Sequence, residues 1–209
     1  MTEFWESAFR DKQAMWGIEP TESAIETAEL FSKKGFKKIL IPGYGYGRNA
    51  KVFTDKGFDV TGIEISKTAI DIAKKHFGKN LEVYHGSVSE MPFDDELYEG
   101  IFCYALIHLL DEKGRTKLID DCYHQLKSGG YMVFVAISKN TPAYEEGIKI
   151  SRDRFKTRHG VKLFYYDSDS VQEEFGHYGL VDSMEIPEPA KLSGNKPPQK
   201  FWKITCKKQ

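Results

Sequence analysis

The sequence predicts an α/β fold built on a doubly wound, mainly parallel sheet. Short apolar runs with strand character alternate with amphipathic helical stretches between residues 37 and 138. A glycine-rich turn follows the first apolar run, where Gly43, Gly45 and Gly47 alternate with other residues. Strands and helices that alternate at this spacing form right-handed crossovers, which place helices on both faces of the sheet. The 209 residues suffice for one buried core, so we expect a single domain over residues 1–209.

Two helical segments precede the first strand. Aromatic and apolar residues between positions 4 and 16 predict a short helix. Pro20 restrains its predecessor to an extended form, and Thr21 or Ser23 can cap a second helix that ends at Gly35.

Five strands with intervening helices follow in order. The strands are expected at residues 37–42, 58–64, 81–85, 100–106 and 131–137. One helix follows Gly47, a second is capped by Ser66, and a third covers residues 116–126 before the stop at Gly129 and Gly130. The loop at 86–93 separates the third strand from the fourth.

The pattern loosens after residue 138. Seven basic residues gather between positions 149 and 162, which we interpret as the solvated face of a helix. A capped helix then begins near Asp167, and residues 180–186 and 200–206 are expected to form an antiparallel, hairpin-like pair of strands joined by a long turn-rich segment.

Composition excludes several classes of function. A net charge of −1 gives no electrostatic reason to bind nucleic acid or an anionic membrane. The three cysteines are widely spaced without a metal-binding pattern, and Cys103 and Cys206 are expected in the core. The acidic run 94–96 predicts a solvated turn, so no metal is expected. Without an apolar leader or membrane-length segment in the sequence, we expect a cytoplasmic protein.

The candidate site begins at the glycine turn. Alternating glycines allow positive φ and bring backbone amides close to a ligand. Glu64 ends the second strand, close to the ~20-residue spacing at which an acid accepts both ribose hydroxyls of a nucleoside. Together these features favour a nucleoside cofactor, either a nicotinamide dinucleotide or S-adenosylmethionine.

The glycine spacing is G-x-G-x-G rather than the G-x-G-x-x-G that dinucleotide enzymes prefer. The chain resembles the class I S-adenosylmethionine-dependent methyltransferases in five stretches, which are residues 39–50, 60–66, 86–95, 98–109 and 126–131. This resemblance implies a seven-stranded Rossmann-like sheet with an antiparallel C-terminal strand. The N-terminal aromatic residues and the closing segment 201–207 resemble the thiopurine and tellurite-resistance methyltransferase group.

The resemblance also divides the chain into three parts and assigns the site. Residues 1–36 would form a helical lid, 37–138 the cofactor-binding core, and 139–209 a substrate-side insert with the C-terminal strands. The implied cofactor-binding residues are Trp16, Gly43, Gly45, Gly47, Asn49, Glu64, Ile65, Ser66, Ser87, Val88 and Tyr104. Tyr104 would lie near the methyl-bearing sulfur, where an aromatic ring stabilises a sulfonium by about 0.5–2 kcal/mol.

Two positions depart from the family pattern. Ile65, Ser87 and Val88 would flank the adenine, but Ser87 stands where the family usually has an aspartate. Ile41 replaces the acid usual two positions before the first glycine, which would orient the methionine ammonium or nearby loop amides.

The expected activity is methyl transfer to a small molecule. A thiol or another soft nucleophile needs little beyond alignment with the sulfonium. A hydroxyl or protonated amine needs a base, for which His108 at the end of the fourth strand is the candidate; a structural role is its alternative. His108 and Tyr104 are therefore the candidate catalytic residues.

The sequence allows alternatives for the function, the charge of the acceptor and the oligomeric state. A nicotinamide-dependent oxidoreductase and a non-catalytic S-adenosylmethionine-binding protein are the alternative functions. If the basic cluster, including Arg152 and Arg154, faces the pocket, the acceptor is anionic. The chain is expected to be a monomer or a homodimer, without nucleic-acid or membrane partners.

Overall fold

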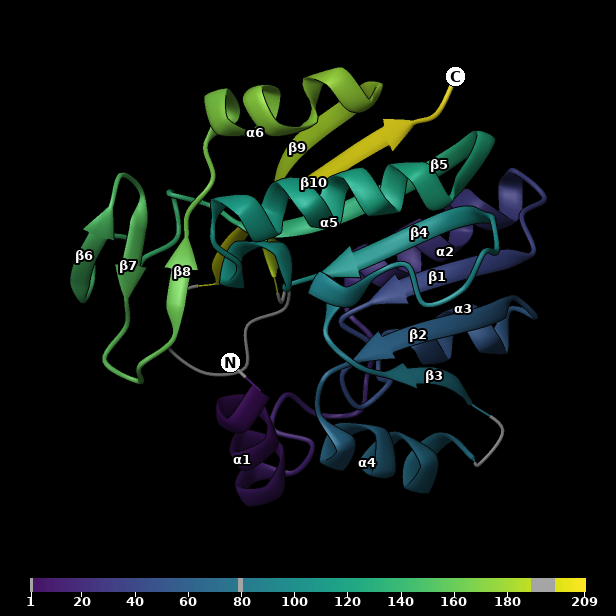
Figure 1. The fold of residues 1–209 in the computed structure, drawn as a ribbon, viewed down its shortest axis with the longest axis horizontal. Coiled ribbons are helices and arrows are strands. Elements are labelled where there is room, and N and C mark those ends of the chain that lie inside the picture. The colour runs from purple at the N-terminus through teal and green to yellow at the C-terminus, as the bar shows by residue number, and fades with distance from the viewer. Residues whose placement is uncertain (1, 79–80, 189–197) are drawn as a thin grey trace.

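The computed structural model describes residues 2–78, 81–188 and 198–209. In this part of the chain a seven-stranded sheet has the order β3-β2-β1-β4-β5-β10-β9 (Figure 1). Its strands are β1 (Lys38–Pro42), β2 (Asp59–Glu64), β3 (Glu82–His85), β4 (Tyr98–Tyr104), β5 (Leu126–Ile137), β9 (Leu180–Glu188) and β10 (Gln199–Lys207). The first five pair in parallel, and β10 is antiparallel to both neighbours. The predicted sheet and its antiparallel C-terminal strand are confirmed.

Helices cover both faces of the sheet. They are α1 (Thr2–Lys12), α2 (Glu22–Lys33), α3 (Ala50–Asp55), α4 (Lys67–Phe77), α5 (Glu112–Gln125) and α6 (Ser168–Phe175), with short 3-10 turns η1 (Val88–Glu90), η2 (Ile107–Leu109) and η3 (Gly176–Tyr178). Phe31 of α2 and Phe53 of α3 pack with Phe102 on one face. Cys122 of α5 and Phe175 of α6 belong to the core of the other face. The doubly wound arrangement is therefore confirmed (Figure 1).

Helix α5 begins earlier than the sequence pattern indicates. Asp111 caps it by accepting from the Gly114 amide at 2.9 Å, and the first turns contain the buried Arg115. Because the charged Arg115 occupies the buried face, the spacing of apolar residues typical of an amphipathic helix is recognisable only from Leu118 onward. The predicted start at residue 116 is thus about one turn late.

The basic segment after residue 147 does not form the expected helix face. It folds into a separate three-stranded antiparallel sheet of β6 (Ile148–Ser151), β7 (Arg154–Lys156) and β8 (Lys162–Phe164) (Figure 1). Phe155 is buried between exposed or half-buried neighbours and packs edge-on against Tyr144 and Tyr165. Strands of three or four residues are too short to show a clear period of two, which explains the wrong prediction.

Further expectations from the sequence concern the buried cysteines, the two C-terminal strands and membrane-spanning segments. Cys103 and Cys206 are fully buried, as predicted, and β9 and β10 form the expected antiparallel pair. Residues 189–197 of the segment that joins these two strands lie outside the described residues. Within the described ranges, every helix is too short or too polar to cross a bilayer.

Gly62 in β2 makes room for the glycine turn. A Cβ at this position would lie 2.3 Å from Cδ2 of the buried Tyr44, the residue between the first two glycines. We expect Gly62→Ala to destabilise the protein by about 1–3 kcal/mol, because the Tyr44 ring must move out of a filled space. Urea unfolding measures this change.

The same substitution in a Tyr44→Ala background provides the control. Without the ring, only Cβ of residue 44 stays close, at 3.1 Å, and glycine is unfavourable in a strand interior, so alanine at position 62 is expected to cost much less than in the wild-type background. An equal loss in both backgrounds would contradict a clash with Tyr44.

Candidate functional site

The glycine turn lies at the carboxyl end of β1. The amides of Gly43 and Tyr44 both donate to the Ile63 carbonyl at 2.9 Å, which joins the turn to β2. Gly43 and Gly45 have φ of 73° and 58°. A Cβ on Gly45 would meet no atom within 4 Å, so this side of the turn is open. The sequence places the loop correctly because strand β1 and its glycines are adjacent in the chain.

Glu64 joins the turn to the end of β2. Its Oε2 accepts from the Gly45 amide at 2.7 Å and its Oε1 from the Ser66 amide at 2.9 Å. The residue is 6% exposed. Burial raises the pKa of Glu64, while the amides of Ser66 and Gly45 oppose this shift. A carboxylate has about four acceptor positions. The amides of Gly45 and Ser66 take two of them and the Ile65 amide also stabilises the charge, so acceptor capacity remains for hydroxyl donors.

Ile41 is part of the apolar core rather than the site. It is buried in the cluster that contains Tyr44 and Phe53. The Gly45 amide is instead held by the Glu64 carboxylate. One task that the resemblance gives to an acid at position 41, orienting a loop amide, is therefore performed by Glu64.

The ends of β2 and β3 bring Ile65 and Ser87 close together. The Gly86 amide donates to the Glu64 carbonyl at 3.0 Å, and the His85 ring bonds the Ile65 carbonyl at 3.2 Å. Ser87 caps the η1 turn, which starts at the buried Val88. The predicted adenine-flanking residues thus lie at adjacent strand ends.

Glu90 supplies a carboxylate to this corner. Its Oε2 accepts from the Ser87 amide at 3.2 Å, as part of a capping box. A Cβ on Gly86 would lie 3.2 Å from the same oxygen. The Ser87 hydroxyl itself accepts from the Ser89 amide, so the charged acceptor in this loop is Glu90, which sequence reasoning missed.

Ser66 has a buried side chain that points to structural partners. Its hydroxyl accepts from the Ala69 amide and donates to Oε2 of Glu6 at 2.6 Å. Glu6 also accepts from the hydroxyl and amide of Thr68, and hydrogen bonds from Ser66 and then Thr68 lower the pKa of Glu6 to about 2. Helix α1 is therefore attached to the start of α4, beside the glycine turn.

The segment after α1 is fixed to the glycine turn by polar contacts. The Tyr46 hydroxyl donates to the Gly17 carbonyl at 2.7 Å and accepts from the Trp16 amide at 3.2 Å. The Trp16 and Tyr46 rings are stacked at 9°, and Trp16 remains 50% exposed. Oδ1 of Asn49 accepts from the Thr21 amide at 2.9 Å. Trp16 and Asn49 are thus brought to the site, and Asn49 serves there to hold the N-terminal segment.

Two charged residues lie beside Tyr104 at the end of β4. The Arg48 guanidinium is 5.8 Å from the Tyr104 ring centre and donates to the Trp16 carbonyl at 3.0 Å. Burial raises the pKa of Tyr104; the negative charge of Glu188 adds to this effect, and Arg48 opposes it. The position of Arg48 directly after the glycines was a usable signal in the sequence. No feature of the sequence pointed to Glu188, which lies far from the glycines along the chain.

His108 is a buried residue of η2. It is 5% exposed, and its Nδ1 accepts from the Ile137 amide at 3.1 Å. Burial lowers the pKa of His108 to about 3. A neutral imidazole that joins η2 to the end of β5 supports the structural alternative, and the general-base role stays a prediction without geometric support.

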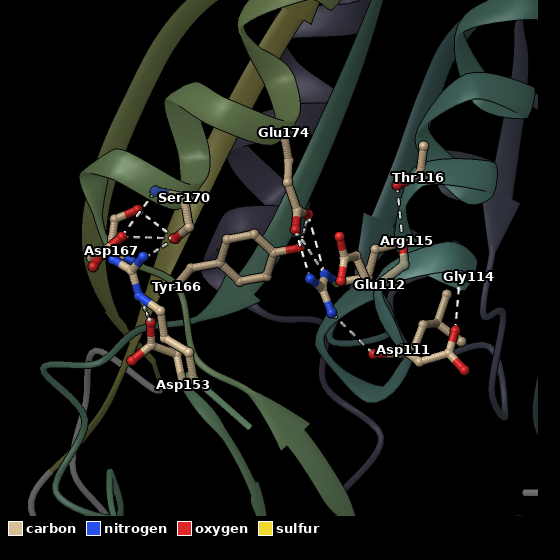
Figure 2. A network of polar contacts seen from close by, with 12 residues as sticks. Asp111, Glu112, Gly114, Arg115, Thr116, Asp153, Tyr166, Asp167, Ser170 and Glu174 are labelled. Carbon is tan, nitrogen blue, oxygen red and sulfur yellow. Dashed lines mark hydrogen bonds and ion pairs between the residues drawn. The ribbon is translucent and has the colours of Figure 1, made fainter. Parts of the chain in front are cut away.

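The basic cluster does not present one common face. The Arg152 side chain is exposed and pairs with Asp153, whereas the Arg154 Nε is buried without a hydrogen-bond partner among the described residues. Figure 2 shows Asp153 and Asp167 on one side of Tyr166, and Arg115 with Glu174 on the other. An anionic acceptor held jointly by Arg152 and Arg154 therefore stays a prediction.

The acidic run forms local contacts. Asp94 accepts from the Tyr98 hydroxyl at 2.8 Å and from the Glu96 amide at 3.0 Å. Glu96 pairs with Lys38 at 2.7 Å. Residues 2–78, 81–188 and 198–209 contain no group of three side chains arranged to hold a metal ion.

Sequence comparisons identify related proteins. A family model described as a methyltransferase domain matches residues 40–134. A ubiquinone biosynthesis O-methyltransferase from Pseudomonas entomophila is 25% identical over 175 residues, which cover 81% of this chain and 73% of the relative. One from Coxiella burnetii is 28% identical over 154 residues, covering 70% and 65%.

Solved structures share the fold. A 1,6-didemethyltoxoflavin-N1-methyltransferase from Burkholderia thailandensis, with bound S-adenosylhomocysteine, superposes with a TM-score of 0.74 at 18% identity, covering 99% of this chain and 86% of that one. TehB from Haemophilus influenzae superposes with a TM-score of 0.69 at 19% identity, covering 98% and 67%.

Proposed function

We propose that this chain is an S-adenosylmethionine-dependent methyltransferase that acts on a small molecule, because a methyltransferase-domain model matches residues 40–134 and the relatives are named as methyltransferases. The observation that carries this proposal is Glu64, which is buried at the end of β2 and holds the Gly45 amide while keeping lone pairs for ribose hydroxyls. The open side of the glycine turn lies next to it.

The residues at the carboxyl edge fit the cofactor. Glu64 would accept from the ribose hydroxyls, and the Glu90 carboxylate offers an acceptor near the adenine position. Arg48, beside the turn, would pair with the cofactor carboxylate. When bound, the cofactor supplies an electrophilic methyl group on a cationic sulfur.

The chain contributes mainly alignment and exclusion of water. Helix α1 and the segment at Trp16 are attached to the edge through Glu6 and Tyr46, so they can cover a bound ligand. The half-buried Tyr104 ring offers an aromatic face for a cationic group. Holding two reactants in line in this way accounts for most of the catalysis that a displacement at carbon needs.

The acceptor class is inferred from the site and the relatives. The relatives are named for O-methylation, and one structural neighbour is named for N-methylation of a small heterocycle. A thiol or another soft nucleophile, the class expected from the sequence, needs no general base. The burial of His108, the candidate base, agrees with that class. Likeness to the tellurite-resistance group rests on fold alone.

Titration calorimetry tests cofactor use. We expect S-adenosylmethionine and S-adenosylhomocysteine to bind, and NAD⁺ to give no heat. Binding of NAD⁺ alone would instead favour the oxidoreductase alternative. If both S-adenosyl ligands bind but mass spectrometry detects no S-adenosylhomocysteine release with any of a wide panel of hydroxyl, amine and thiol acceptors, the non-catalytic alternative would be favoured.

A further inference from the structure

One carboxylate oxygen of Glu188 has no hydrogen-bond partner among residues 2–78, 81–188 and 198–209. The residue ends β9 and is 4% exposed. Its Oε1 accepts from the Ser23 amide in the first turn of α2, at 2.8 Å. Its Oε2 is buried and has no hydrogen-bond partner among the described residues. Capping of α2 therefore accounts for one oxygen of Glu188. The Tyr104 hydroxyl approaches the same carboxylate closely enough that, besides burial, their hydrogen bonding contributes to the raised pKa of Tyr104, yet Oε2 has no hydrogen bond of normal geometry within the described ranges.

An unpartnered carboxylate oxygen is costly in a protein interior. Buried polar atoms are nearly always hydrogen-bonded, and a charged one loses more by desolvation than a neutral one. An acceptor oxygen in this state is therefore suited to a ligand that brings its own N–H or O–H donor.

Glu188 lies at the same edge of the sheet as Tyr104. Because β10 is antiparallel to both β5 and β9, the carboxyl ends of β9 and β5 lie on one side. Ile186, Phe201 and Ile137 form one row across these strands, and Glu188 lies two residues beyond it. The Phe201 ring stacks on Tyr104, with centres 6.1 Å apart.

The charges around Tyr104 are divided between two elements. Arg48 approaches from the glycine turn, and Glu188 from β9. The positive group thus comes from the element that carries the glycine turn, and the negative group from the C-terminal strands.

We propose that Oε2 of Glu188 binds the nucleophile of the methyl acceptor, and that this nucleophile is a hydroxyl or an amine. The inference rests on the proposed function. A thiolate would meet a like charge at Glu188, whereas a hydroxyl or amine donates to it. The acceptor class therefore shifts from the soft nucleophile expected from the sequence to a hydrogen-bond donor.

A cofactor analogue tests this placement without knowledge of the acceptor. In sinefungin a carbon replaces the sulfur and carries a protonated amine at the position of the transferred methyl group, whereas S-adenosylhomocysteine has no group at that position. Calorimetry with both gives a selectivity ratio, the Kd of S-adenosylhomocysteine divided by that of sinefungin. We expect Glu188→Gln to lower this ratio ~10- to 100-fold, as for loss of a charge-assisted hydrogen bond, with S-adenosylhomocysteine affinity within about 2-fold.

Two further variants show whether a change in the selectivity ratio comes from the Glu188 charge. Glutamine retains an oxygen for the Ser23 amide, so Glu188→Gln preserves the cap. Glu22→Gln removes one exposed carboxylate from the same turn of α2 and is expected to leave the ratio unchanged. Arg48→Gln removes the opposing positive charge and is expected to raise the ratio, even though it weakens both ligands.

The outcomes separate the two proposals. An unchanged ratio in Glu188→Gln, or an equal loss of both ligands, would assign Glu188 to helix capping only and overturn the inference. Failure of wild-type protein to bind S-adenosylmethionine, S-adenosylhomocysteine and sinefungin would overturn the proposed function and the inference with it.

Discussion

Glu64→Gln is expected to weaken S-adenosylmethionine binding about 100-fold. The ionised carboxylate can accept from both ribose hydroxyls while it holds the amides of Gly45 and Ser66. The neutral amide has one acceptor atom and turns its NH₂ group toward one of these donors. Loss of one or two hydrogen bonds to a charged group costs about 1.5–3 kcal/mol each. Isothermal titration calorimetry measures the change.

Asp59→Asn is the matched control for this variant. Asp59 begins the same strand at its opposite, exposed end, so it removes the same charge from β2 without touching the site. We expect its affinity for S-adenosylmethionine to equal that of the wild type. Wild-type affinity in Glu64→Gln would contradict the role of Glu64 in the cofactor site.

The affinity for the cofactor is also expected to depend on pH through Glu64. Burial raises the pKa of Glu64, so the free protein takes up this proton at a higher pH than an exposed glutamate does. Only the ionised form can accept from both hydroxyls, so affinity is full above the raised pKa and falls as the pH decreases through it. The part of the pH dependence that Glu64→Gln removes belongs to this residue.

Arg115→Met is expected to cause the largest loss of stability, about 3–5 kcal/mol. Arg115 of α5 is buried, and its Nη2 lies 2.8 Å from Oε1 of Glu174 on α6. The Tyr166 hydroxyl donates to Oε2 of the same carboxylate at 2.7 Å (Figure 2). The Arg115 guanidinium also covers the Phe164 ring, with 3.8 Å to its centre. Without the arginine, Glu174 is a partly buried charge, and among the described residues Tyr166 is the one remaining side chain that donates a hydrogen bond to it.

Urea unfolding measures the stability of Arg115→Met and of two control variants. Lys67→Met breaks an exposed pair with Asp71 on α4 and is expected to cost less than about 1 kcal/mol. Adding Glu174→Leu to Arg115→Met is expected to recover part of the stability, because the unpaired charge is removed. A cost for Arg115→Met no larger than that for Lys67→Met would show that the pair does not hold α5 to α6.

Features set by neighbouring residues were predictable. The glycine turn follows an apolar strand directly, and Glu64 ends the next strand of the chain, which pairs in parallel beside the first. Knowing both strands was therefore enough to place Glu64 and the glycine turn at the same edge of the sheet. Helix α5 shows the limit of this reasoning, since its buried Arg115 is charged and disguises the buried face.

Features set by distant residues were not predictable. In the three-stranded sheet formed by the basic segment, Phe155 packs against Tyr144 and Tyr165. The spacing of apolar residues within the segment does not indicate these contacts. His108 looks available in the sequence, yet the amide of Ile137 occupies its Nδ1. In both cases tertiary packing decides what local propensity leaves open.

The α/β class, the succession of the first five strands along the chain, and the glycine turn with Glu64 follow from the amino-acid sequence alone. These depend on hydrophobic period and on backbone freedom at glycine, which are properties of contiguous residues. The folded structure was needed to show that Glu188 caps α2 through Ser23, that Arg48 and Glu188 approach Tyr104, and that His108 is buried. Burial and charge pairing depend on which distant elements meet, so they become readable only when the sheet is assembled.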